Sequence, residues 1–276
     1  MGDAAAPPAI ALEDITCTFV SRGGVGRYTA VAATSLAVQP GEFVAVVGPT
    51  GCGKSTLLNV AAGLLAPSSG RVLVHGRPID GINARAGYMF QTDALMPWRN
   101  AIDNVTAGLE FRGVPRGEAR AKAQAWLDRV GLGGFEDRYP HQLSGGMRKR
   151  VSLAQMLILD PELLLMDEPF SALDVQTRSL MENELLDLWS ANRKSVMFIT
   201  HDLEEAIALS DRVVVLSAGP ATRPIGEFAV DLPRPRDVAE IRMTPRFVAL
   251  HEAIWRVLRD EVLKGYEQGK RKAATA

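Results

Sequence analysis

The sequence contains few cysteines and no long apolar run. Its two cysteines, Cys17 and Cys52, cannot form a disulfide framework, which indicates a reducing compartment. No apolar stretch approaches the roughly 20 residues that a membrane-spanning helix needs. The N-terminal segment 1–8 has neither a basic region nor an apolar core, so we expect no signal peptide. We therefore expect a protein that is soluble by itself and reaches a membrane only through a partner.

An excess of charge of one sign is also missing. The 31 basic and 32 acidic residues leave a formal net charge of −1, which does not suggest a broad basic surface for nucleic acid. Hydrophobic residues make up 47% of the 276 residues and charged residues 23%, as in an ordinary globular protein. This length is enough for one large or two modest units with a real core.

A glycine-rich stretch follows the apolar run 42–47 and precedes a run that reads as a helix, 57–62. Strand, glycine loop and helix is the context of a phosphate-binding loop. Gly48, Gly51 and Gly53 let the backbone N–H groups turn inward, and the following helix directs its positive end to the same point. Lys54 adds a mobile positive charge for phosphates, and Ser55 offers a hydroxyl to Mg²⁺. The full candidate set in this loop is Gly48, Pro49, Thr50, Gly51, Cys52, Gly53, Lys54, Ser55 and Thr56.

Short apolar runs recur along the chain and predict parallel strands buried on both faces. The run 163–166 ends at Asp167 and Glu168, and the run 196–200 ends at His201. Residues 213–216 form a third run. Ligands bind at the carboxyl ends of such strands, so these polar residues and the phosphate loop should converge on one edge. Residues 10–47 read as β-rich, with a loop at 21–26.

Between residues 95 and 159 the apolar spacing becomes helical. Ile102, Val105 and Leu109 begin it, and Ala121, Ala125, Leu127 and Val130 follow. We read this segment as a helical insertion. After a Pro-Arg-Pro-Arg linker, the residues from Phe247 to Leu258 have amphipathic spacing, and we expect this helix to pack on the domain or on a second copy.

Asp167 follows four apolar residues, as expected of a carboxylate that holds a metal beside a phosphate loop. Glu168 would point to the opposite face of an extended chain, where it could orient an attacking water. This division of roles fits hydrolysis of a terminal phosphate.

A second glycine motif lies at Leu143–Met147. Ser144 is expected to cap a helix running from about Gly146 to Leu159. Arg148, Lys149 and Arg150 in its first turns oppose the helix dipole, and an anion nearby would be one reason to tolerate them. A plain capped helix is the alternative.

These motifs, in this order and spacing, resemble those of an ABC transporter ATPase subunit over residues 10–230. They are Gly48–Thr56, Gln91, Leu143–Gly146, Leu165–Pro169, Ser171–Asp174 and Thr200–Asp202. Segments 95–100, 199–206 and 217–220 look like the nitrate/sulfonate/taurine-type importer subfamily. The resemblance implies an α/β fold, a P-loop NTPase (RecA-like) core with an antiparallel β subdomain and an α-helical subdomain. It implies four segments: 1–94, 95–159, 160–232 and a C-terminal helical extension at 233–276.

The resemblance also implies roles for single residues, with ATP and Mg²⁺ as ligands. Phe19 would stack on adenine, with Tyr28 as the alternative, and Gly51–Thr56 would hold the phosphates. Lys54 and His201 would contact the γ-phosphate, and Glu168 would be the catalytic base. Ser55, Gln91 and Asp167 would surround Mg²⁺. Ser144, Gly145 and Gly146 would reach the ATP of a second copy, and Asp174 would sit at the subunit junction.

The implied partners are a second copy in a head-to-tail dimer, two permease subunits docked at Gln91–Arg99 and, indirectly, a solute-binding protein. The protein would sit on the cytoplasmic side of the inner membrane. Trp98 could instead be simple core filling, and Cys52 could be open to alkylation. Met147 and Gln155 stand where the family usually has Gln and Arg.

Two other functions remain as alternatives. A soluble ABC ATPase acting on nucleic acid or ribosomes is disfavoured because no long insertion separates Lys54 from Ser144 and the charge is not basic. A P-loop kinase would not need the second glycine motif or His201.

Overall fold

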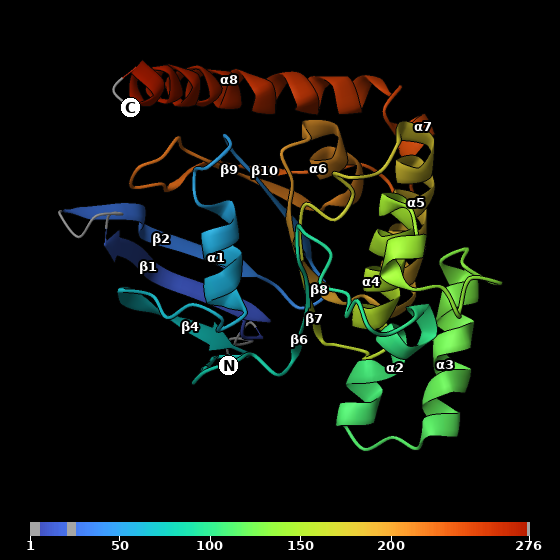
Figure 1. Cartoon of the computed structure of the whole chain (residues 1–276). Helices are drawn as coiled ribbons and strands as arrows, with labels where there is room; N and C mark the ends of the chain where they lie inside the picture. The colour runs from blue at the N-terminus through green and yellow to red at the C-terminus, as the bar shows by residue number, and fades with distance from the viewer. Residues whose placement is uncertain (1–5, 21–25, 275–276) are drawn as a thin grey trace, which may run out of the picture.

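The computed structural model describes residues 6–20 and 26–274, and it contains two β-sheets (Figure 1). The first sheet is antiparallel, with strand order β2-β1-β4-β5. Its strands are β1 (Ile10–Val20), β2 (Arg27–Val38), β4 (Ser69–Val74) and β5 (Arg77–Pro78). The predicted loop between β1 and β2 falls mainly on residues 21–25, which lie outside the described residues, as do residues 1–5 of the N-terminal segment.

The second sheet has six strands in the order β10-β9-β3-β8-β7-β6. All neighbours are parallel except β10, which runs antiparallel to β9. The strands are β3 (Phe43–Val47), β6 (Ala86–Met89), β7 (Leu163–Asp167), β8 (Ser195–Ile199), β9 (Arg212–Leu216) and β10 (Pro224–Ala229). The carboxyl ends of five parallel strands therefore share one edge, as the apolar runs predicted.

The second sheet is buried because different elements cover its two faces. Alternate residues of β3 belong to different hydrophobic cores. Val44 and Val46 pack in one core with β1, β2 and helix α1 (Lys54–Ala61). Phe43, Ala45 and Val47 pack in the other core. That second core contains helices α5 (Val175–Asn192) and α6 (Leu203–Leu209). Burial on both faces explains why these strands are continuous apolar runs.

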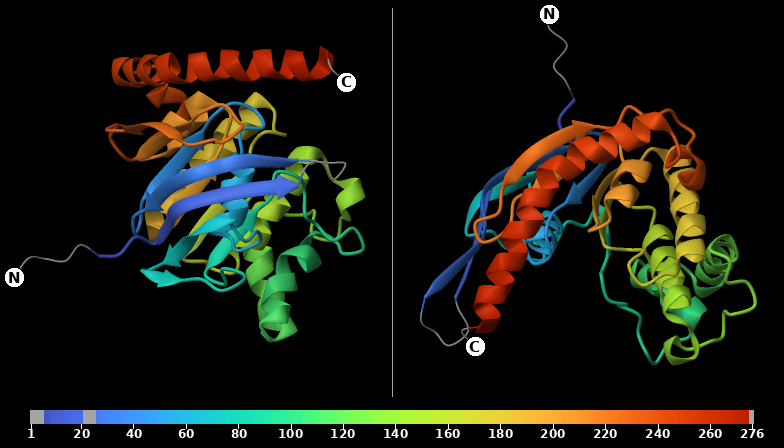
Figure 2. Two further views of the ribbon diagram at one scale, coloured as in Figure 1. Left: turned by 90° about the vertical axis from the view of Figure 1, so that its left-hand side faces the viewer. Right: turned by 90° about the horizontal axis from the view of Figure 1, so that it is seen from above.

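Three helices lie between β6 and β7 and form a separate arm beside the sheets (Figure 2). They are α2 (Ala101–Phe111), α3 (Arg116–Arg129) and α4 (Gly145–Leu157), with a short 3-10 turn η1 (Pro140–Gln142) before α4. The predicted helical insertion is confirmed here, although the segment boundaries at 94, 159 and 232 stay predictions.

The predicted buried face of α3 is partly wrong. Leu127 and Val130 are buried as predicted, but Ala121 and Ala125 are exposed, and Ala119 and Ala123 are buried in their place. Alanine is compatible with either face of a helix, so its spacing alone does not identify the packed side.

The C-terminal segment forms α7 (Val238–Ile241) and the long helix α8 (Pro245–Ala274), which crosses the top of the view in Figure 1. Phe247, Leu250, Ile254 and Leu258 are buried in the chain's own core. Farther along α8, the Glu261 carboxylate accepts a hydrogen bond of 2.7 Å from the N–H of Ala218. A side chain at Gly265 would lie 3.4 Å from Pro49, so α8 reaches the phosphate loop. The basic stretch 270–272 continues this helix.

Glu182 on α5 is expected to make stability depend on pH. Its carboxylate is fully buried, and burial raises its pKa to about 7 although Arg242 lies 3.2 Å away and lowers it. The folded protein therefore holds this proton more tightly than the unfolded chain, so the group favours folding at low pH. That contribution is lost as pH rises through about 7. Between about pH 5 and pH 8, Glu182→Gln should gain up to about 3 kcal/mol of stability relative to wild type.

The measurement is the free energy of urea unfolding of both proteins across this pH range. Glu162→Gln is the control, because it removes the charge of a carboxylate that is half exposed and not buried. A difference between Glu182→Gln and wild type that stays constant with pH would contradict the expectation.

Candidate functional site

The phosphate loop joins the buried end of β3 to the start of α1. Gly51 and Gly53 adopt positive φ angles of 74° and 109°, which glycine tolerates best. No described side chain caps the N-terminus of α1, so its first N–H groups are free for an anion. The Lys54 ammonium is buried and donates to the carbonyls of Gly48 at 2.8 Å and Pro49 at 3.1 Å. The loop thus holds a cation and a set of amide donors in one place.

Cys52 is buried inside this loop, 2% exposed, and burial raises the pKa of its thiol. A buried thiol that resists ionisation is a poor nucleophile. The predicted susceptibility of Cys52 to alkylation is therefore not supported by its surroundings.

Asp167 ends β7 and is 5% exposed. Burial raises the pKa of its carboxyl, whereas a hydrogen bond from Ser55 lowers it. Its buried Oδ1 atom has no hydrogen-bond partner among the described residues. A buried carboxylate oxygen without a partner beside a serine hydroxyl fits a small divalent cation that prefers oxygen ligands.

Glu168 is reached by side chains from two neighbouring strand ends. Its Oε2 atom accepts a hydrogen bond of 3.0 Å from the amide Nε2 of Gln91, which follows β6. The same oxygen lies 3.1 Å from Nδ1 of His201, which follows β8. The predicted convergence of Glu168 and His201 at one sheet edge is therefore found. Gln91 joins them there, so the carboxylate is held between two side chains that can also hold a water.

We predicted that Glu168 points away from Asp167 because the chain would be extended there, and the predicted extended conformation was wrong. The residue is not extended: its φ is 46°, and its N–H donates to the carbonyl of Ile199 on β8 at 2.9 Å. A left-handed backbone at a non-glycine residue costs free energy and occurs often at functional sites. The turn directly after β7 therefore sets the direction of the Glu168 side chain, and strand alternation does not.

Ser144 caps α4 as predicted, and its hydroxyl accepts the N–H of Met147 at 3.2 Å. The helix begins one residue earlier than expected, at Gly145, and ends at Leu157. In the part of the chain that the structure describes, no hydrogen bond joins Ser144, Gly145 or Gly146 to the phosphate loop. The second glycine motif is thus not tied to the first by hydrogen bonds within one chain.

The three basic residues of α4 do not point to an anion. Each has acceptors within the chain: Arg148 bonds to Asp93 at 2.7 Å, Lys149 to the carbonyls of Phe90 and Gln91, and Arg150 to the carbonyls of Val130 and Gly131. The argument from the helix dipole overlooked these partners because most of them are far away in sequence.

Asp174 caps α5 by accepting the N–H of Thr177 at 3.0 Å. One turn later, Arg178 donates to the carbonyl of Leu173 at 3.2 Å and to Asp202 at 3.4 Å. Asp202 follows His201 and caps α6. Arg178 therefore connects the Asp174 turn to the His201 turn, a link that the sequence reading missed and that no local motif marks.

Phe19 and Tyr28 face each other across β1 and β2 in register. Side chains of directly paired residues in antiparallel strands lie on the same face. They are 39% and 36% exposed. Both aromatic side chains are therefore partly exposed on one surface, and the choice between them for adenine stays open.

A groove runs between β6, α2 and α4. Of the predicted docking segment, Thr92, Ala94 and Met96 line it, together with Phe111 of α2 and Gln155 of α4. Gln91 and Trp98 do not line it. Trp98 is 74% exposed on the same segment, so its interpretation as core filling was wrong.

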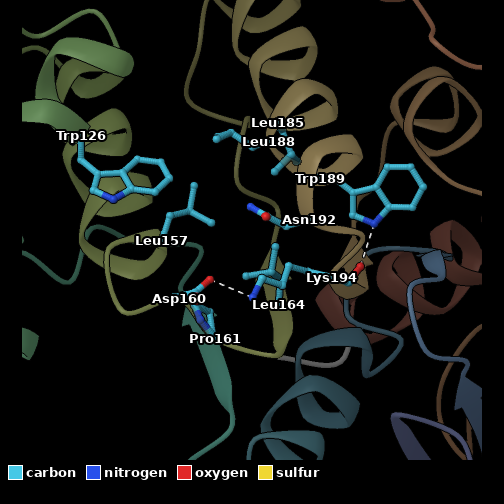
Figure 3. Close-up of a pocket in the computed structure, with 10 residues that line it drawn as sticks. All are labelled: Trp126, Leu157, Asp160, Pro161, Leu164, Leu185, Leu188, Trp189, Asn192 and Lys194. Atoms are coloured by element: carbon cyan, nitrogen blue, oxygen red, sulfur yellow. Dashed lines mark hydrogen bonds and ion pairs between the residues drawn. The ribbon is translucent and has the colours of Figure 1, made fainter. Parts of the chain in front are cut away.

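A separate pocket lies away from the predicted site residues, between Trp126 on α3 and Trp189 on α5 (Figure 3). Lys194 pairs with Asp160 at 2.8 Å beside it, and the indole N–H of Trp189 donates to the carbonyl of Lys194. Four leucines also line it: Leu157, Leu164, Leu185 and Leu188. None of the predicted binding or catalytic residues lines it, so we read it as a packing gap between the helical arm and the core.

Within residues 6–20 and 26–274, no helix has the length and apolar character needed to span a membrane.

The family model described as "ABC transporter" matches residues 31–171.

Several relatives share most of the chain. A taurine import ATP-binding protein of Burkholderia pseudomallei is 44% identical over 88% of this chain and 94% of its own length. The taurine import ATP-binding protein of Pseudomonas aeruginosa is 43% identical over 88% and 92%. An uncharacterized ABC transporter ATP-binding protein of Methanocaldococcus jannaschii is 48% identical over 92% of both chains.

A solved dimeric structure of an ATP-binding cassette, in a post-hydrolysis state with ADP and Pi, covers 81% of this chain and all of its own. Its TM-score is 0.73 and its sequence identity is 29%. The predicted fold class, a P-loop NTPase core with a β and a helical subdomain, is confirmed by this likeness together with the two sheets and the helical arm. The chain belongs to the ABC transporter family, as an ATP-binding subunit whose ATPase activity is coupled to transport.

Proposed function

We propose that two copies of this chain bind two ATP molecules between them and use ATP-driven closure to power an importer of a small anion. The observation that carries the proposal is that the site is incomplete in one chain. Gln91, Glu168 and His201 converge at the strand ends, whereas Ser144 caps a helix with no hydrogen bond to the phosphate loop. A second copy placed head to tail would supply the missing donor to each site.

Within this proposal Glu168 is the general base. Its carboxylate would accept a proton from the attacking water, while Gln91 and His201, which both contact Oε2, would hold that water in line with the γ-phosphate. Lys54 would exchange its two carbonyl contacts for β- and γ-phosphate oxygens. The amides of Gly51–Thr56 would hold the phosphates, and Phe19 or Tyr28 would stack on adenine.

Ser55, Gln91 and Asp167 would hold Mg²⁺, for which the partnerless Oδ1 atom of Asp167 is suited. When bound, the ion would neutralise charge on the β- and γ-phosphates.

The second copy would contribute Ser144, Gly145 and Gly146 to the γ-phosphate, and Asp174 would lie at the junction. Met147 leaves the serine and glycine contacts unchanged. Arg178 would then link the junction to His201 through the carbonyl of Leu173 and the side chain of Asp202. The dimeric solved structure with ADP and Pi supports this arrangement by likeness.

Two permease subunits would dock at Gln91–Arg99, each inserting a cytoplasmic helix into the groove lined by Met96 and Phe111. The exposure of Trp98 and Phe111, 74% and 80%, supports a contact there. The protein would then sit at the cytoplasmic face of the inner membrane.

The names of the taurine import relatives support a sulfonate-like anion as the transported substrate, with nitrate as the related alternative, delivered by a solute-binding protein.

Trp98→Ala is expected to uncouple transport while leaving the basal ATPase of the isolated subunit unchanged. Trp98 is exposed and is not one of the residues assigned to nucleotide binding, so its loss should weaken only the docking of the permease. The test is co-purification with co-expressed permease subunits, together with taurine-stimulated ATPase in vesicles that contain the permease and a solute-binding protein. We expect stimulation to fall about tenfold or more, as for an interface anchor.

Trp255→Ala is the matched control, because Trp255 is a half-exposed tryptophan on α8. The proposed coupling fails if Trp98→Ala and Trp255→Ala behave alike. Co-purification of wild type with ribosomes or DNA, and with no permease, would favour the alternative of a soluble ABC ATPase.

A further inference from the structure

Lys149 is a buried cation whose side-chain hydrogen bonds and ion pair, among the described residues, lie on the loop that carries Gln91. It sits in the first turns of α4 and is 4% exposed. Its ammonium group donates to the carbonyl of Phe90 at 3.0 Å and to the carbonyl of Gln91. The carboxylate of Asp93, on the same loop, lies 3.9 Å away.

All three N–H donors of the Lys149 ammonium group can be directed at residues 90–93. A lysine offers three N–H donors, and here two meet carbonyls and the third can face a carboxylate. Burial lowers the pKa of Lys149 while Asp93 raises it. An ammonium group is costly to bury unless it is paired, so these contacts fix the loop firmly against the helix.

The two ends of this connection belong to different nucleotide sites in the proposed dimer. The N-terminus of α4 is Ser144, which would contact the ATP of the opposite copy. The Gln91 side chain bonds to Glu168 of its own copy at 3.0 Å. Within one copy, therefore, Ser144 and Gln91 are connected through the first turn of α4 and the buried ammonium group of Lys149. Arg148 adds a second tie to the same loop through Asp93 at 2.7 Å.

We propose that Lys149 is a positioning residue that couples the two ATP sites, because it holds the Gln91 loop to the helix that reads ATP in the opposite site. The inference rests on the proposed function, since it needs the paired sites. When ATP draws Ser144 toward the opposite copy, α4 moves, and Lys149 carries the backbone of Gln91 with it. Gln91 and Glu168 then reach their working geometry only when both sites are filled.

The test is steady-state ATP hydrolysis by full-length wild type, Lys149→Met and Lys149→Gln. Methionine keeps the length and loses every donor, whereas glutamine keeps an amide donor without the charge. For wild type we expect cooperative hydrolysis with a Hill coefficient above 1 and at most about 2, the limit for two sites. Lys149→Met should bring the coefficient to about 1 and lower kcat about tenfold, with Lys149→Gln intermediate.

Arg150→Met is the matched control. Arg150 lies on the next position of the same helix and also bonds to two carbonyls, but these belong to Val130 and Gly131 and not to the Gln91 loop. We expect this variant to keep the wild-type Hill coefficient. Thermal unfolding without nucleotide identifies any variant that is poorly folded, and Lys149→Gln then carries the comparison.

The outcomes separate the inference from the function on which it rests. A wild type with no ATP-dependent dimer and a Hill coefficient of 1 overturns the proposed function. A cooperative wild type whose cooperativity is unchanged in both Lys149 variants overturns the inference alone. A Lys149→Met variant that loses kcat but keeps its Hill coefficient also overturns it, because the residue then supports only its own site.

Discussion

Glu168→Gln is expected to bind ATP but to hydrolyse it about a hundredfold or more slowly than wild type, the usual contribution of a general base. The amide is nearly isosteric, so Gln91 and His201 can stay near it, but it cannot accept a proton from water. ATP should therefore persist in the closed state and trap a dimer. Phosphate release measures the first effect, and gel filtration with and without ATP measures the second.

Glu162→Gln is a suitable control for this variant. Glu162 lies directly before the first residue of β7, at the end of the strand away from Glu168, and it pairs at the surface with Arg85 and His75. Its loss should leave both turnover and dimerisation unchanged. If Glu168→Gln hydrolysed ATP at the wild-type rate, the assignment of Glu168 as the base would be wrong.

Lys54→Ala is expected to weaken ATP binding about a hundredfold or more. Hydrogen bonds to charged groups contribute about 1.5–3 kcal/mol each, and about 1.4 kcal/mol corresponds to a factor of ten in affinity. Lys54 would provide such bonds to two phosphates. Its ammonium group is already held at the loop by Gly48 and Pro49, so little ordering remains to oppose binding. Calorimetric titration of ATP measures the dissociation constant.

Lys122→Ala removes the same charge from the surface of α3, where Lys122 pairs with Glu118 at 2.7 Å. This control should bind ATP as wild type does. An affinity of Lys54→Ala within about threefold of wild type would exclude a phosphate role for Lys54, because that change is under 1 kcal/mol.

The sequence alone was sufficient wherever function depends on local chemistry. The glycines at 51 and 53 are needed by the positive φ angles of the loop itself, and Ser144 caps a helix that begins at the next residue. Apolar runs predicted buried parallel strands, and parallel strands bring the phosphate loop, Glu168 and His201 to one edge by topology alone. These inferences need only neighbours in the chain or a general rule of sheets.

The remaining features were decided by tertiary contacts. Lys149 meets carbonyls 58 and 59 residues away, and Arg178 meets Asp202 24 residues away. The backbone of Glu168 is held in its left-handed form next to Ile199 of another strand. The exposure of Trp98 depends on how the helical arm packs. Sequence patterns record the spacing of residues along the chain but not which distant acceptor a charged side chain finds. For that physical reason the positions of the phosphate loop and the strand-end carboxylates were predictable from the sequence, and the contacts that connect them were not.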